Sequence, residues 1–211
     1  MRSRFDEEMA LLHRELTRMG ALCEEAIALT AQALDGDRSL AAKAPALEGE
    51  IDQMERDIEN HCLSLLLRQQ PVARDLRTIS TALKMVTDLQ RIGDQAANIA
   101  ELSLLLAKQG RAKVPEHIGT MSRKTGIMVS QAIAAYTDRD VELAHAVINL
   151  DDEVDDLFAA VKAELIDRIL ANRDDADAAI DLIIIAKYLE RVADHAVNIA
   201  QWAVFCVTGQ L

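Results

Sequence analysis

The chain has 211 residues, of which 50% are hydrophobic but only 3% aromatic, with 8 Gly and 3 Pro. Strands and their turns depend on aromatic residues, Gly and Pro, so this composition excludes a β-rich fold and favours an all-α protein built from Ala, Leu, Ile and Met. The net charge of −12 excludes nucleic acid and anionic membranes as expected partners, because an acidic surface repels both.

The sequence also predicts a compartment. Cys23, Cys62 and Cys206 are odd in number and far apart, which argues against a disulfide framework and favours a reducing environment. The N-terminal stretch MRSRFDEEMALL lacks the apolar core of a signal peptide. No uncharged apolar run approaches the roughly 18 residues of a membrane span. We therefore expect a cytoplasmic protein without direct membrane insertion.

Apolar residues recur every three or four positions, which predicts long amphipathic helices. The turn signals DGD, QQP, TDRD and NRDD, together with the joining segment KQGRAKVPE, separate the helices. Pro45 does not fit inside a helix and is expected to restart one as its first residue. The expected helices lie near residues 5–35, 38–69, 72–107, 116–137, 140–171 and 174–207.

An internal repeat organises these helices. The line DLQRIGDQAANIAEL, at 88–102, returns 100 residues later as YLERVADHAVNIAQW, at 188–202. Earlier blocks, such as LEGEID and LDDEVD, match at an offset of 103, and the three missing residues fall at a turn. A repeat of this length that changes only at a turn indicates a duplicated domain. We predict two three-helix bundles in tandem, over residues 1–110 and 111–211.

Acidic side chains repeat on matching helices of the two copies. Glu190 and Asp194 stand four residues apart on the sixth helix, and the same spacing relates Glu48 to Asp52 and Asp151 to Asp155 on the second and fifth. Like charges at this spacing cost a helix about 0.2–0.5 kcal/mol per pair. Either hard cations compensate this repulsion through shared carboxylate ligands, or the acidic faces are simply solvated. The spacing alone leaves both interpretations open.

The segments RQQPVARDLRTISTALKMVTDLQRIGDQAANIAE and LERVADHAVNIA resemble the PhoU family over nearly the whole chain. That resemblance implies a pair of three-helix bundles with metal ions bound by Glu/Asp-x-x-x-Asp pairs. Gln90 departs from the family pattern, which usually has Glu there, so the second copy is the better candidate site. The implied ligands are Glu48, Asp52, Asp94, Asp151, Asp155, Glu190 and Asp194, supported by Gln90, Asn98, Glu101, Asn198 and His195.

The resemblance also implies a function. It predicts a negative regulator of the phosphate-starvation response that modulates high-affinity phosphate transport and is not an enzyme. The implied partners are a sensor histidine kinase and the ATPase subunit of the phosphate ABC transporter, and the implied assembly is a homodimer. The expected cofactors are divalent or trivalent ions such as Fe, Zn, Mn or Mg. The alternative is a metal-binding or metal-storage protein with no role in phosphate signalling.

Overall fold

The computed structural model describes residues 2–69, 71–109 and 113–210. These residues form seven α-helices and two short 3-10 helices, which confirms the all-α fold class. In chain order they are α1 (Arg2–Asp35), η1 (Arg38–Lys43), α2 (Ala44–Gln69), α3 (Ala73–Gln109), α4 (Glu116–Asp138), α5 (Val141–Asn149), α6 (Asp151–Ala171), η2 (Arg173–Asp175) and α7 (Ala176–Thr208).

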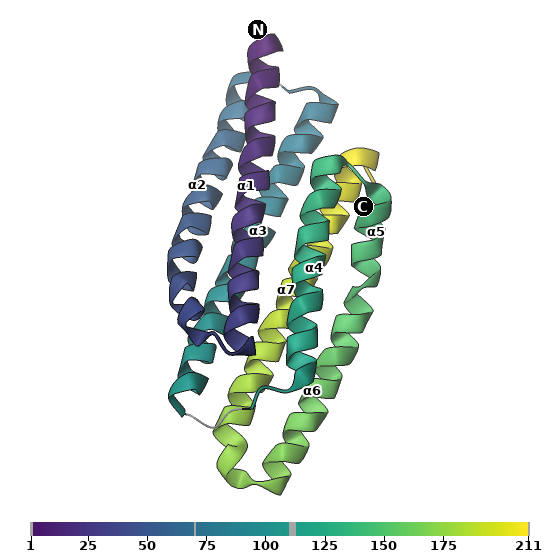
Figure 1. Cartoon of the computed structure of the whole chain (residues 1–211). Coiled ribbons are helices and arrows are strands. Elements are labelled where there is room, and N and C mark those ends of the chain that lie inside the picture. The colour runs from purple at the N-terminus through teal and green to yellow at the C-terminus, as the bar shows by residue number, and fades with distance from the viewer. Residues whose placement is uncertain (1, 70, 110–112, 211) are drawn as a thin grey trace.

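The helices form the two predicted three-helix bundles (Figure 1). The first consists of α1, α2 and α3, and the second of α4, the pair α5 and α6, and α7. The predicted boundary between residues 110 and 111 lies outside the described residues. Among the residues that are described, no helix is both long and apolar enough to cross a membrane.

Two predicted helices are interrupted. The prediction of one helix over 38–69 is wrong at its start, because residues 38–43 form η1 and α2 begins at Ala44. Pro45 therefore lies in the first turn of α2, where its missing N–H costs nothing. The predicted helix over 140–171 breaks at Leu150 into α5 and α6. Three acidic residues, Asp151 to Glu153, fill the first turn of α6, where the free N–H groups favour negative charge.

One hydrophobic core runs through both bundles, because α3 packs along α7 and α1 packs along α4. Ile92 and Ile99 of α3 and Ile185 and Ile199 of α7 are completely buried in it. Burying such a side chain contributes about 1.5–3 kcal/mol. The tandem repeat is therefore a single packed unit and not two bundles joined only by a linker.

The same core positions the acidic residues. On α2, Ile51 is buried against α3 and approaches it so closely that a Cβ on Gly93 would lie 3.0 Å from Ile51 Cδ1. Asp52 and Asp94 directly follow these two residues in the sequence. The tight contact between α2 and α3 therefore brings the acidic row of one helix up to the acidic row of the other.

Candidate functional site

The structure brings the four predicted acidic residues of the second repeat together. Asp151 and Asp155 lie on α6, and Glu190 and Asp194 lie on α7, which packs against it. Asp151 and Glu190 are partly buried, whereas Asp155 and Asp194 are exposed. We call these four side chains the second acidic cluster.

Burial and repulsion raise the pKa values of two members of the second acidic cluster, Asp151 and Asp194. Burial, followed by the charges of Asp155, Asp194, Asp152 and Glu190, raises the pKa of Asp151 to about 6. The pKa of Asp194 is also raised, first by burial and then by Glu190, although Lys187 opposes this shift. Ionisation of these carboxylates is therefore unfavourable, and a nearby cation would relieve the repulsion between them.

Lys187 places a positive charge beside the second acidic cluster. Its ammonium forms an ion pair with Glu190 one helical turn away and lies 5.5 Å from the ring centre of Phe158. The Glu190 oxygen in this ion pair is Oε2, which is otherwise enclosed by protein. Lys187 thus neutralises the Glu190 carboxylate, and a metal ion bound by Glu190 would have to displace this ammonium.

The matching residues of the first repeat, Glu48, Asp52, Gln90 and Asp94, are held together differently; we call them the first acidic cluster. Gln90 Nε2 donates to Asp52 Oδ1 at 3.1 Å and to Asp94 Oδ1 at 2.7 Å. Arg91 Nη1 donates to Asp94 Oδ2 at 3.1 Å. The amide of Gln90 therefore bridges two carboxylates from α2 and α3, so this cluster has its own compensation for charge repulsion.

Glu55 is a neighbour of the first acidic cluster that the sequence analysis missed. Burial, then Glu59 and Asp52, raises the pKa of Glu55, and Asp94 adds to the shift. Burial, Asp94 and Asp52 raise the pKa of Glu48 in the same way. Glu55 stands three residues after Asp52, a helical spacing that extends the acidic row and could have revealed it. Its counterpart in the second repeat is the apolar Phe158, so the repeat gave no signal.

Asn198 and His195, predicted to support the ligands, instead contact the other repeat. Asn198 Nδ2 donates to Asp88 Oδ1 at 3.0 Å, and His195 Nδ1 lies 2.9 Å from the same oxygen. Asp88 belongs to α3, so this contact ties α7 to the first bundle. Asp88 was also missed, because its repeat counterpart is Tyr188 and no acidic pattern points to it.

Asn98 and Glu101 form no hydrogen bond with a predicted ligand among the described residues. Together with Glu48 they line a hollow of about 250 Å³ between the start of α2 and the second half of α3. Of the predicted supporting residues, Gln90 is the one that forms hydrogen bonds to predicted ligands within the described structure.

The donor chemistry of the two clusters differs in its fit to a metal ion. Within the described ranges, no three His, Cys, Asp or Glu side chains surround one point closely enough to hold an ion. The second acidic cluster still offers carboxylate oxygens only, and oxygen ligands suit hard cations. The first cluster fits less well, since Gln90 already satisfies Asp52 and Asp94. Metal binding stays a prediction.

Comparison with known proteins places this architecture in a family. The PhoU domain model matches residues 16–103 and again residues 118–203. A phosphate-specific transport system accessory protein PhoU homologue of Clostridium acetobutylicum is 33% identical and covers 98% of this chain and 95% of its own. A protein of the same name from Synechocystis sp. is 35% identical, with 99% and 93% covered. The crystal structure of PhoU from Pseudomonas aeruginosa has a TM-score of 0.91 at 32% identity and covers 98% of this chain and 100% of its own. This chain belongs to the PhoU family.

Proposed function

We propose that this chain is a negative regulator of the phosphate-starvation response and a modulator of high-affinity phosphate transport. The observation that carries the proposal is the match, over nearly their full length, to relatives named as accessory proteins of phosphate-specific transport. The chain would act in the cytoplasm, as a homodimer, through contacts with a sensor histidine kinase and with the ATPase subunit of the phosphate transporter.

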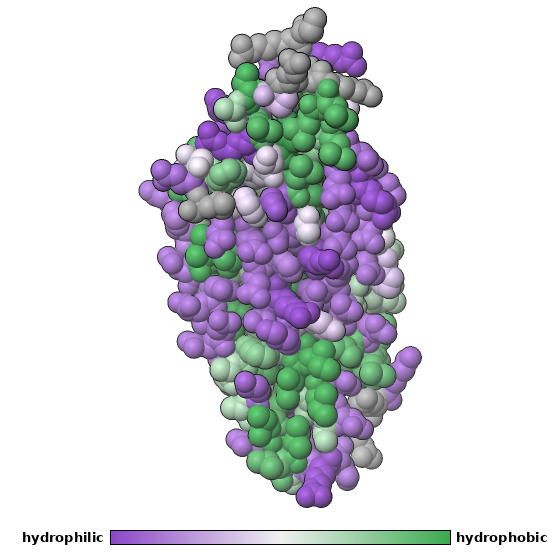
Figure 2. Space-filling model, turned by 180° about the vertical axis from the view of Figure 1, so that it is seen from behind, coloured by the Kyte–Doolittle hydropathy of each residue, from purple (hydrophilic) through white to green (hydrophobic). Residues whose placement is uncertain are grey.

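The surface offers apolar contacts for such partners. Leu67 at the end of α2 is 84% exposed, and Leu170 at the end of α6 is 78% exposed. These helix ends lie at opposite ends of the molecule (Figure 1), and Figure 2 shows hydrophobic patches near both ends of one face with a polar band between them. Exposed apolar side chains next to polar surface are typical of protein contact sites.

The partner contacts are tested by binding of the purified chain to the purified ATPase subunit and to the cytoplasmic part of the kinase. We expect a stable complex with at least one of them. Leu170→Glu or Leu67→Glu should weaken that complex at least tenfold, while Ile127→Glu, at an exposed position in the middle of α4, should not. Failure of the wild-type chain to bind either protein would refute the proposed contacts.

Metal binding without a role in phosphate signalling is the second candidate function. The raised pKa values of Asp151 and Asp194 favour it, because a cation would relieve the repulsion between these carboxylates. Calorimetric titration of chelator-treated protein with Fe, Zn, Mn and Mg ions tests it. Asp194→Asn should abolish binding. Asp156→Asn, which removes an exposed carboxylate of α6, should leave it unchanged. Absence of binding by all four ions would exclude this function.

A further inference from the structure

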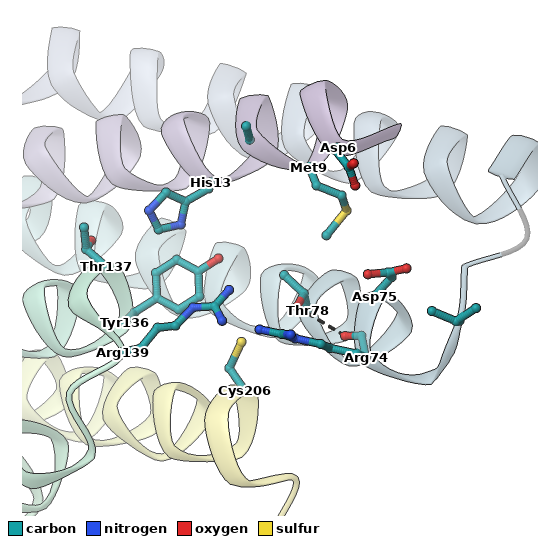
Figure 3. A pocket seen from close by; sticks show the side chains of 12 residues that line it. Asp6, Met9, His13, Arg74, Asp75, Thr78, Tyr136, Thr137, Arg139 and Cys206 are labelled. Carbon is teal, nitrogen blue, oxygen red and sulfur yellow. Dashed lines mark hydrogen bonds between the residues drawn. The ribbon is translucent and has the colours of Figure 1, made fainter. Parts of the chain in front are cut away.

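A pocket of about 520 Å³ opens where the two bundles meet, away from both acidic clusters (Figure 3). Its walls come from the first half of α1, the start of α3, the end of α4 and the end of α7. Its volume lies within the range of roughly 300–1,000 Å³ that is usual for small-molecule sites. Both repeats therefore contribute to one cavity of a size that accepts a ligand.

Two arginines line this pocket. Arg74 lies in the first turn of α3, and Arg139 follows the last turn of α4 with a left-handed backbone (φ 57). No carboxylate in the described part of the chain forms an ion pair with either guanidinium, although the chain has 35 acidic and 23 basic residues. Figure 3 shows both guanidinium groups on one side of the pocket, with the carboxylates of Asp6 and Asp75 on another.

Tyr136 adds a buried polar group to the basic side of the pocket. The residue is only 6% exposed, and Figure 3 shows its hydroxyl pointing into the cavity. This hydroxyl is open to the pocket and forms no hydrogen bond with a described residue, whereas the enclosed Thr137 Oγ1 lacks a partner among the described residues. Burial raises the pKa of Tyr136, so the hydroxyl keeps its proton and is available as a donor. A ligand in the pocket would therefore accept a hydrogen bond from the Tyr136 hydroxyl.

The positive charge of Arg139 acts inside the pocket. The ring of His13 lies 5.4 Å from the ring of Tyr136, and Arg139 contributes, after burial, to a lowered pKa of His13. Arg139 therefore lies close enough to His13 to disfavour protonation of the imidazole. The same field favours an anion.

We propose that this pocket binds a phosphoryl oxyanion, either inorganic phosphate or the phosphoryl group of a small organic molecule. Arg74 and Arg139 would donate to its oxygens through the planar guanidinium fork that suits phosphate, and Tyr136 would donate a further hydrogen bond. Asp75 would accept a hydrogen bond from a P–OH group, a donor that sulfate lacks at neutral pH. The site therefore selects phosphate over sulfate. This inference does not depend on the proposed partner contacts.

The thiol of Cys206 allows binding in this pocket to be measured. It lines the pocket and is partly exposed, whereas Cys23 and Cys62 are buried. The rate at which iodoacetamide alkylates Cys206, followed by mass spectrometry on the full chain, therefore reports whether the pocket is filled. Inorganic phosphate and ADP are the two ligand probes, and sulfate is the control anion.

Phosphate at saturating concentration should slow alkylation of Cys206 at least tenfold, and sulfate should protect much less. Arg139→Gln and Arg74→Gln should each weaken phosphate binding about tenfold or more, whereas Arg18→Gln, an equal charge change on α1 outside the pocket, should not. Protection by ADP but not by phosphate would assign the site to organic phosphates. The inference is overturned if neither ligand slows alkylation, or if folded Arg139→Gln and Arg74→Gln are protected as well as Arg18→Gln.

Discussion

Replacement of Asp151 by Asn tests the charge repulsion in the second acidic cluster. The carboxylate is partly buried and faces Asp155, Asp194 and Glu190, and its pKa is raised to about 6 from an ordinary 3.8. A carboxyl group with a raised pKa destabilises the folded protein when it is ionised. The penalty is absent below pH 3.8, grows between pH 3.8 and 6, and is complete above pH 6. Asp151→Asn removes it.

The pKa values bound the size of this effect. A rise from 3.8 to about 6 corresponds to at most about 3 kcal/mol of destabilisation at pH 8. Asp151 is only partly buried, so water and salt screen the repulsion. Its replacement also removes a negative charge that the first turn of α6 favours, so the gain should be smaller than this limit. We expect Asp151→Asn to raise the free energy of unfolding by about 1 kcal/mol at pH 8 and by almost nothing near pH 4.

Urea denaturation followed by circular dichroism measures this gain, in chelator at pH 8 and near pH 4. Asp156→Asn serves as the control, because it removes an exposed carboxylate of α6 and should change stability by less than about 0.5 kcal/mol. If Asp151→Asn destabilises the metal-free protein at pH 8, or raises its free energy of unfolding equally at both pH values, the repulsion argument is wrong.

Three further predictions concern packing and hydrogen bonds, each measured by urea denaturation. Gly20→Ala should lower the free energy of unfolding by about 1 kcal/mol, because the new Cβ would lie 2.9 Å from Ile133 Cδ1. Gly49→Ala, whose new Cβ would have nothing within 4 Å, should raise it by about 0.5–1 kcal/mol. Equal effects of the two changes would contradict the close contact of Gly20 with Ile133. Gln90→Glu should destabilise metal-free protein by about 1–3 kcal/mol, because it replaces the bridging donor with a fourth carboxylate in the first acidic cluster. An unchanged stability would argue against the bridge. Asp88→Ala should cost about 2 kcal/mol by removing the acceptor shared between the repeats, and an unchanged midpoint would show that this contact is not stabilising.

The sequence predicts the helices well because their apolar spacing is local. Ile51 and Ile92 follow that spacing and are completely buried. The break at Leu150 escaped prediction because the apolar row that begins there continues through Val154, so periodicity alone showed no interruption. The break coincides with the acidic first turn of α6, a local feature that apolar spacing does not register.

The acidic clusters were predictable because matching acidic residues occur at equivalent positions of both repeats. The contact of Asp88 with His195 and Asn198 was not, since it joins the two repeats and depends on how α3 packs along α7. The pocket was hidden for the same reason. Arg74 and Arg139 are far apart in the sequence, and only the packing of the two bundles brings them to one cavity.

The regulatory function is tested most directly by alkaline phosphatase activity in phosphate-rich medium, in a strain that lacks its own PhoU-type protein. Wild-type chain and Glu190→Gln/Asp194→Asn are compared at equal levels of folded protein. We predict that the wild type restores repression of the enzyme, and the double variant then reports whether the second acidic cluster is needed. Full expression of the enzyme in the presence of well-folded wild-type protein would contradict a role in the phosphate-starvation response.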